Sequence, residues 1–396
     1  MNKPNKPAQT HNLLGSDGYS WYNPLIMKEL LKKLVQAETT VEKGELAAAE
    51  VICAELGLSG IESQIDSWGN NRANITAQVK SSGQKKGLLF VCHLDVVPPG
   101  GASWEYPPFS AVEIDGRIHG RGSADMKGGI AAAVTAIRQI VDSDIELNGD
   151  IIFFAAAGEE TDSCGALRYV QDLRIMPELA GVIIPEPTDF EVVTRHRGIF
   201  WLKVTTKGKT AHGSTPELGI NAITSMKAFL DELEDYEIAY GPHKLLGSCS
   251  MSINRIFGGK AINVVPDQCD VEIDIRTLPG QNYGEIISDF EKIFAKLKQQ
   301  NPQFEAEVSV VRDVAPLETD ENSGFVRDFC SAVGINETRA VGFTTDGPHF
   351  AFLGVPEVIF GPGKPHLCHK PDEYIDISDA ERAVEYYKNI ILKFLS

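Results

Sequence analysis

Four short apolar runs alternate with helical patterns along the outer parts of the chain. Three runs, at residues 88–97, 151–157 and 181–185, have the continuous hydrophobic pattern of strands buried on both faces. A fourth run spans residues 355–360, and helical patterns occupy residues 126–141 and 380–395. Strands that alternate with helices predict an open α/β sheet with helices on its faces.

The middle of the chain has a different order of elements. Strand patterns at residues 199–206, 250–257, 268–276 and 304–311 are interleaved with helical patterns at residues 219–234 and 283–298. This β-α-β-β-α-β order is typical of the ferredoxin-like arrangement. We therefore expect residues 197–312 to form a second domain, inserted into a first domain that comprises residues 1–196 and 313–396. The length of 396 residues also favours two domains over one core.

Charge and composition exclude several classes of function. The chain has 55 acidic and 37 basic side chains, a net charge of −18, which argues against nucleic acid as a partner and is compatible with bound cations. No apolar run reaches the roughly 18 residues of a membrane span, and residues 1–12 lack the apolar core of a signal peptide. The 7 cysteines are odd in number and never spaced as C-x-x-C, so we expect reduced thiols in a cytoplasmic protein.

Polar residues that can bind metal ions follow the apolar runs where each predicted strand ends. They are His93, Asp95, Glu159, Glu160 and Glu186. In open α/β sheets, sites form at the carboxyl ends of the strands, which is where these residues are expected. His93 and Asp95 are predicted to lie within one strand, so their side chains share a face, and the carboxylate can orient the imidazole.

Asp125 stands at the predicted start of the helix at residues 126–141. Taken alone it has the pattern of an N-cap residue. The preceding Gly120-x-Gly122 resembles part of a dinucleotide-binding loop, but Asp125 occupies the position of the third glycine. A nucleotide-binding function is therefore disfavoured.

The adjacent carboxylates of Glu159 and Glu160 are the most specific local feature. Buried without a cation they would be costly, whereas in a solvated loop they would be ordinary. Because neighbouring residues point in different directions, one can bind a metal ion while the other faces the substrate. A second imidazole comes from His369 or from His366, and spacing alone does not choose between them.

Two imidazoles and three carboxylates predict a site for two divalent ions, zinc or cobalt, with one bridging carboxylate. Magnesium and calcium would favour oxygen ligands without histidine. Two such ions can activate a water molecule and polarise a carbonyl group together.

The segments that carry these residues resemble, in order, those of the metallopeptidase M20 family. They are His93-Leu-Asp-Val-Val-Pro, His119-Gly-Arg-Gly-Ser-Ala-Asp-Met-Lys-Gly-Gly, Gly158-Glu-Glu, Glu186-Pro-Thr, Ala211-His-Gly-Ser-Thr-Pro and His369-Lys-Pro-Asp-Glu-Tyr. The resemblance implies a zinc-peptidase-like mixed sheet and an inserted lid that carries a dimer interface.

The resemblance also implies a role for each residue of the metal site. One ion would be held by His93 and Glu186, the other by Glu160 and His369, and Asp125 would bridge them. Asp95 would be the outer-shell aspartate and Glu159 the general base. A cis peptide bond is expected between Asp125 and Met126.

Further positions on the lid and the main domain match substrate-contacting residues of the family. His212 would enter the partner subunit's site and stabilise the oxyanion, although a lone histidine is often structural. Arg197, Asn263, Arg276 and Thr344 would contact the substrate. The arginines are suited to bidentate capture of a carboxylate, and equally to ordinary surface ion pairs.

The function implied is hydrolysis of the acyl-amide bond of a small N-acylated amino acid by a homodimer. Sequence features of acetylornithine deacetylases and of succinyl-diaminopimelate desuccinylases are mixed in this chain. The alternatives are a dipeptidase or glutamate carboxypeptidase of the same family and, from another class, a non-catalytic metal-binding relative. Loss of Glu159 or of a metal ligand would indicate the non-catalytic relative, and none of these residues is missing.

Overall fold

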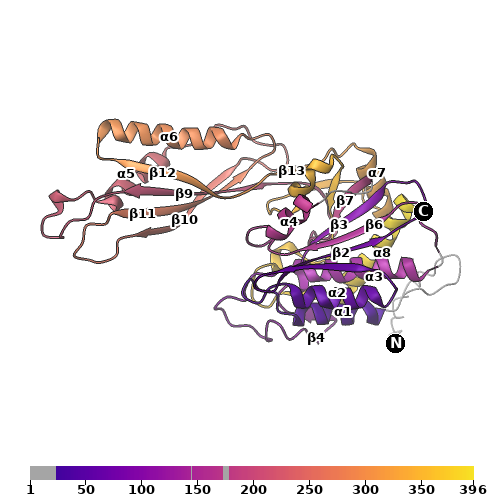
Figure 1. The fold of residues 1–396 in the computed structure, drawn as a ribbon. Coiled ribbons are helices and arrows are strands. Elements are labelled where there is room, and N and C mark those ends of the chain that lie inside the picture. Colours follow the sequence, from indigo (N-terminus) through magenta and orange to yellow (C-terminus); the bar gives the residue numbers. More distant parts are fainter. Residues whose placement is uncertain (1–23, 144, 173–177) are drawn as a thin grey trace, which may run out of the picture.

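The computed structural model describes residues 24–143, 145–172 and 178–396, and its largest element is a mixed sheet of nine strands (Figure 1). The first twelve residues, expected to lack a signal-peptide core, lie outside this part. The strand order is β1 (Ser63–Trp68), β2 (Arg72–Val79), β6 (Ile151–Ala156), β3 (Gly87–His93), β7 (Leu179–Ile184), β15 (Glu357–Ile359), β8 (Val192–His196) and β13 (Leu317–Glu318), and β14 (Thr338–Val341) pairs with β8. The four central strands β6, β3, β7 and β15 are mutually parallel. Their carboxyl ends therefore meet at one edge.

Helices cover both faces of this sheet, as the alternation of strands and helices predicted. One face packs against α1 (Pro24–Gln36), α2 (Leu46–Gly57), α3 (Gly128–Asp142) and α8 (Ile377–Leu395), with α7 (Gly324–Val333) beside α8. The other face packs against α4 (Cys164–Asp172) and the short 3₁₀ helix η3 (Gly347–Leu353). Strand β3 serves both cores: Leu88, Phe90 and Cys92 join the first, and Leu89 and Val91 the second. This two-residue period explains its unbroken apolar sequence.

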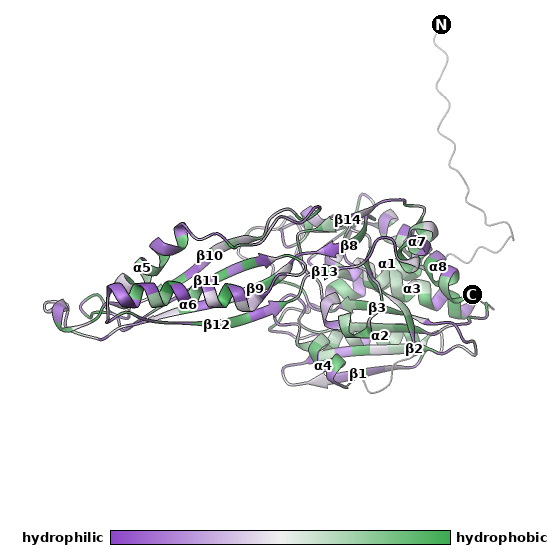
Figure 2. Ribbon diagram, turned by 90° about the horizontal axis from the view of Figure 1, so that it is seen from above, coloured by the Kyte–Doolittle hydropathy of each residue, from purple (hydrophilic) through white to green (hydrophobic). Residues whose placement is uncertain are grey.

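The lid is a separate antiparallel sheet that extends away from the nine-stranded sheet (Figure 1). Its order is β10 (Ser250–Gly258), β11 (Gln268–Thr277), β9 (Gly198–Lys207) and β12 (Glu305–Val314). Helices α5 (Ala222–Glu234) and α6 (Tyr283–Gln300) cover one face and share an apolar core with the strands. Figure 2 shows hydrophilic and hydrophobic residues interleaved along α6, as expected of a helix with one buried side. The ferredoxin-like order is confirmed, whereas the division into two domains stays a prediction.

Two local expectations near the site are corrected by the backbone. Strand β3 ends at His93, so Asp95 lies in the following loop and does not share a strand face with His93. Asp125 is not an N-cap residue, because it lies inside a π-helical turn, η1 (Ser123–Lys127), and the N-cap of α3 is Lys127. The expected cis peptide bond between Asp125 and Met126 is present.

A small third sheet brings the C-terminal motif beside this turn. It consists of β4 (Val112–Ile114), β5 (Arg117–His119) and β16 (Tyr374–Asp376), with Tyr374 opposite His119. Between β15 and β16 lies the 3₁₀ helix η4 (Pro365–Leu367). In the described part of the chain, no helix combines the length and apolarity needed to cross a membrane.

A buried histidine stands at the passage from the main sheet to the lid. His196 ends β8, its Nδ1 donates to the Arg197 carbonyl over 2.8 Å, and its Nε2 accepts from the Thr345 hydroxyl over 3.1 Å. Both ring nitrogens are thus satisfied by a neutral imidazole. Burial lowers the pKa of His196 to about 4, from an ordinary value of 6.5.

We therefore predict that His196 makes the fold less stable in mild acid. Between pH 6.5 and 4 the unfolded chain binds a proton that the folded chain excludes. Lowering the pH through this range therefore lowers the free energy of unfolding, by up to about 3 kcal/mol. The free energy of unfolding in urea should converge for wild type and His196→Asn as pH drops from 7 to 5. A gap that stays constant over this range would contradict the prediction.

Candidate metal centre

The five predicted metal ligands meet at the carboxyl edge of the parallel strands. His93 is the last residue of β3, Glu160 follows β6, and Glu186 follows β7. Asp125 enters from η1 and His369 from the loop after η4. The residues form two groups, His93 with Asp125 and Glu186, and Asp125 with Glu160 and His369, and within each group the ligand atoms all lie within 4.8 Å of one another.

Asp125 belongs to both groups because its two oxygens face different imidazoles. Its Oδ1 lies 3.2 Å from His93 Nε2, which is also 3.4 Å from Glu186 Oε1. Its Oδ2 lies 3.2 Å from His369 Nε2, which is also 2.9 Å from Glu160 Oε1. Each group therefore offers one imidazole nitrogen, one private carboxylate and one oxygen of a shared carboxylate.

The electrostatics of the two groups favour bound cations. Burial raises the pKa of Glu186 well above its ordinary value, although His93 opposes this shift. Hydrogen bonds to Asp125 and Glu160 raise the pKa of His369 to about 10. Buried and half-buried carboxylates this close together are costly unless positive charge neutralises them. Two imidazoles and three carboxylates suit two divalent ions, so the donor set fits the implied metals.

Asp95 supports the site through the backbone. Its Oδ1 accepts hydrogen bonds from the amides of Gly158 and Glu159, over 3.0 and 3.1 Å, and its Oδ2 accepts one from the amide of Glu160 over 3.0 Å. The Asp95 carbonyl lies 3.0 Å from Nδ1 of His93, which turns Nε2 of that ring toward the groups. Asp95 thus fixes both an imidazole and the turn that carries the two glutamates.

Glu373, which was not among the predicted site residues, holds the backbone of Asp125 in a similar way. Its Oε1 accepts hydrogen bonds from the amides of Ala124 and Asp125, over 3.0 and 3.2 Å. Its Oε2 pairs with Nη1 of Arg121 at 2.6 Å, and this ion pair is buried. The sequence feature that could have identified Glu373 as a site residue is its place in the same motif as His369.

Glu159 lies beside both groups without belonging to either. Its side chain is 8% exposed, and burial raises the pKa of Glu159 well above the ordinary value. Nearby Asp346, Glu160 and Glu186 raise it further, while His93 opposes the shift. A carboxylate in this position has a high proton affinity and no ligand role in the two groups.

Other predicted positions are not brought to the two groups in this single chain. His212 is exposed beyond the far end of β9, a ten-residue strand about 30 Å long. Asn263 is its neighbour, since the Asn263 carbonyl accepts from the amide of Gly213 over 2.8 Å. His366, the competitor of His369, is exposed and outside both groups.

The remaining predicted substrate contacts are engaged in local interactions. Nη2 of Arg197 donates to the Leu246 carbonyl over 2.6 Å, and the Thr344 hydroxyl donates to the Arg197 carbonyl over 2.7 Å. Arg276 pairs with Asp274 on its own strand at 3.0 Å. Arg197 and Thr344 thus lie together where the main sheet passes into the lid.

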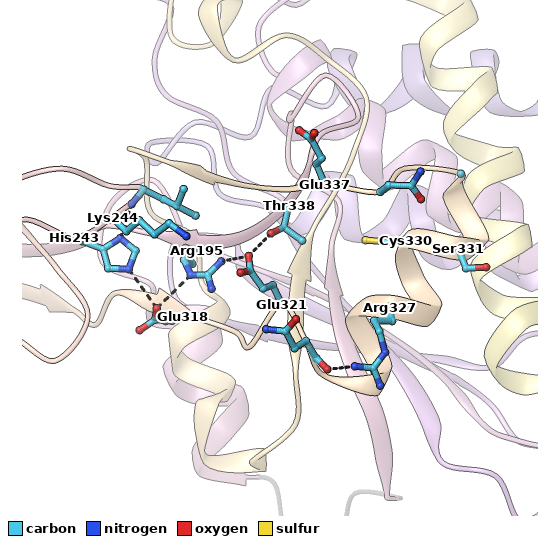
Figure 3. A pocket seen from close by; sticks show the side chains of 14 residues that line it. Arg195, His243, Lys244, Glu318, Glu321, Arg327, Cys330, Ser331, Glu337 and Thr338 are labelled. Atoms are coloured by element: carbon cyan, nitrogen blue, oxygen red, sulfur yellow. Dashed lines mark hydrogen bonds and ion pairs between the residues drawn. The ribbon is translucent and has the colours of Figure 1, made fainter.

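A cavity of about 960 Å³ opens beside this passage (Figure 3). Its charged lining is largely self-paired: Glu318 lies 3.2 Å from Arg195 and 3.3 Å from His243 of the lid. Arg195 also pairs with Glu321 at 3.3 Å. None of the residues that line this cavity belongs to the two ligand groups, so the cavity is a separate feature, where the loop that carries His243 contacts β13 of the main sheet.

Comparison with known proteins identifies the family of the chain. The model of peptidase family M20/M25/M40 matches residues 89–393. The chain belongs to peptidase family M20/M25/M40. As a member of this family it is a hydrolase that acts on amide bonds.

Curated relatives resemble the chain over nearly its whole length. A probable succinyl-diaminopimelate desuccinylase of Staphylococcus epidermidis is 28% identical over 402 aligned residues, which cover 92% of this chain and 97% of that protein. An acetylornithine deacetylase of Myxococcus xanthus is 29% identical over 366 residues, covering 90% and 94%. Among solved structures, an M20 family metallo-carboxypeptidase of Sulfolobus solfataricus superposes with a TM-score of 0.76 at 19% identity, covering 93% and 98%. This last likeness supports the fold.

We predict that Glu373→Gln weakens metal binding by about 10–100-fold, because the amide cannot hold both Arg121 and the Asp125 backbone as the carboxylate does. Titration of the metal-free protein with zinc, read by calorimetry, measures this change. The matched control is Glu385→Gln, which removes an exposed ion pair with Lys388 on α8. Equal affinities for the two variants would refute the role given to Glu373.

Proposed function

We propose that the protein is a two-metal amidohydrolase that cleaves the acyl-amide bond of an N-acylated amino acid. The observation that carries the proposal is Asp125, which is shared between two imidazole–carboxylate groups beside the buried, unshared carboxylate of Glu159. The names of the curated relatives support an acetylornithine deacetylase or a succinyl-diaminopimelate desuccinylase as the type of enzyme.

Each residue of the site then has a role. His93 and Glu186 would hold one ion, Glu160 and His369 would hold the other, and Asp125 would be the ligand shared by both. We take zinc as the metal, with cobalt as a substitute, because imidazole and carboxylate ligands suit both. Two such ions would polarise the scissile carbonyl and lower the pKa of a coordinated water.

Glu159 is the proton carrier of the reaction. Its high proton affinity suits a general base that accepts a proton from water and then donates it to the departing amine. Asp95 serves by fixing the backbone of this residue. Arg197, Asn263, Arg276 and Thr344 are proposed to bind the substrate, the arginines through its carboxylate.

The position of His212 supports a homodimer. Because β9 keeps His212 about 30 Å from the passage to the main domain, the imidazole can complete a site only in a second copy. The lid also has an apolar surface for such contact, on the edge strand β10 and in the loop that follows it. Its members include Ile253, Ile256, Phe257, Ile262 and Val264, all exposed in the single chain. All 7 cysteines are free, which supports a reducing, cytoplasmic location.

The experiment that tests the proposal is hydrolysis of a small panel by the zinc- or cobalt-loaded protein. The panel contains N-acetylornithine, N-succinyl-diaminopimelate, N-acetylmethionine, a dipeptide and folyl-glutamate. Preference for one of the first three supports a deacylase and identifies its acyl group. Preference for the dipeptide or folyl-glutamate would replace it with a peptidase. Activity on none, with two ions bound, would overturn the proposal.

We predict that Glu159→Ala retains two bound ions and lowers turnover by about 10²–10⁴-fold, since the proton carrier is lost and the ligands remain. Metal content is measured by atomic emission and turnover on the preferred compound. Glu160→Ala is the matched control and should lose an ion, because that carboxylate is a ligand. The reverse result would exchange the two assignments.

We predict that His212→Ala lowers turnover by about 10²–10³-fold through loss of an oxyanion donor. Mixing His212→Ala with Glu159→Ala then tests whether the histidine acts across subunits. A mixed dimer regains one site with both residues intact only if His212 comes from the partner. Activity should therefore recover on subunit exchange, and no recovery would place the histidine's action within one chain.

A further inference from the structure

The loop that carries Glu159 and Glu160 is held through its amides by the main domain. The Ala157 amide donates to Oδ1 of Asn74 over 3.0 Å, and Asp95 accepts from the next three amides. These contacts fix the amide groups but leave the carbonyl of Glu159 to another partner. That carbonyl belongs to the peptide group between the two glutamates, so its position bears on both side chains.

The partner of this carbonyl comes from the lid. Nη2 of Arg312, near the end of β12, donates to the Glu159 carbonyl over 2.7 Å and to Oγ of Ser163 over 3.0 Å. The guanidinium lies 5.4 Å from the ring centre of Trp201 on the neighbouring strand β9. A cation over an aromatic face is attracted to it, so Trp201 helps to hold the arginine in place.

A β-bulge in strand β12 of the lid directs Arg312 toward the loop that carries Glu159. Val310 pairs with Leu202 and Arg312 pairs with Trp201, so Val311 is an extra residue in β12. Such a bulge bends the strand and redirects the side chains that follow it, and bulges recur beside active sites for this reason. Val311 itself is exposed, as expected of the inserted residue.

We propose that Arg312 is a positioning residue through which the lid holds the backbone of Glu159. The peptide group between Glu159 and Glu160 is fixed at its N–H by Asp95 and at its C=O by Arg312. The main domain and the lid thus hold opposite ends of one peptide, and the aim of the Glu159 side chain depends on both. This inference rests on the proposed function for the role of Glu159 as base, but the anchoring itself does not.

The test compares Arg312→Ala and Arg312→Lys with the control Lys207→Ala in the metal-loaded protein. Lys207 pairs with Glu307 across the same two strands at their distant end, so its loss perturbs the lid without touching the loop. Hydrogen–deuterium exchange of a peptide covering residues 157–163 reports the anchoring without reference to activity. Metal content, kcat and KM are measured on the same samples.

For Arg312→Ala we expect faster exchange of the loop amides, two retained ions and a kcat lower by about 10–100-fold, with KM changed by less than about 3-fold. Arg312→Lys keeps the charge but not the planar fork, so it should change both readouts in the same direction by less. Lys207→Ala should behave as wild type. If Arg312 had only a structural role in joining the lid to the Glu159 loop, its loss would lower thermal stability and leave kcat unchanged.

Unchanged exchange in Arg312→Ala would overturn the anchoring, and faster exchange with an unchanged kcat would overturn the positioning role. An equal loss of kcat in Lys207→Ala would also overturn it, since the effect would then belong to the lid in general. If Arg312→Ala does not fold, Arg312→Lys decides, and wild-type values in that variant contradict the proposal. If the wild type hydrolyses nothing in the panel, the proposed function fails and exchange alone still decides the anchoring.

Discussion

The structure depends on placing several buried carboxylates close together in spite of their mutual electrostatic repulsion. Two of them, Asp95 and Glu373, are occupied by backbone amides, and Glu373 also pairs with Arg121. Because these two satisfy their charge within the protein, they can fix the turns that carry Glu160 and Asp125. The ligand carboxylates are then left to face the imidazoles, and positive ions are what this part of the protein still requires.

The sheet topology makes this arrangement possible. Parallel pairing of β6, β3, β7 and β15 delivers residues that are far apart in sequence to one edge. The small sheet of β5 and β16 adds the C-terminal motif, so that Glu373 reaches a backbone amide 249 positions earlier in the chain. The rigid strands position the site, and the loops after them supply its chemistry.

The sequence predicted the strands well, and it pointed to the five residues that the fold brings together, because both have local signatures. Continuous apolar runs identify strands buried on two faces, and the M20 motifs are compact. The contacts made by three other residues had no such signature, although two of these residues, Asp95 and Glu373, lie within the motifs. Asp95 acts through the loop beyond β3, where a strand pattern cannot show where pairing stops. Glu373 acts through a contact with residues that are distant in the sequence. Arg312 points toward the Glu159 loop because of a β-bulge, which the pattern of alternating polar and apolar residues does not reveal.

The two lid proposals together have a consequence for how the proposed dimer would work. Arg312 joins the lid to the Glu159 loop of its own chain, whereas His212, at the far end of the same lid, is proposed to act in the site of a second copy. One lid would then act on two sites. In its own chain it would hold the loop that carries the base, and in the second copy it would supply the oxyanion donor. Since the lid strands are continuous between these ends, a rotation of the lid would change both sites at once. Lid movement would couple the two subunits even though each chain carries a full set of metal ligands.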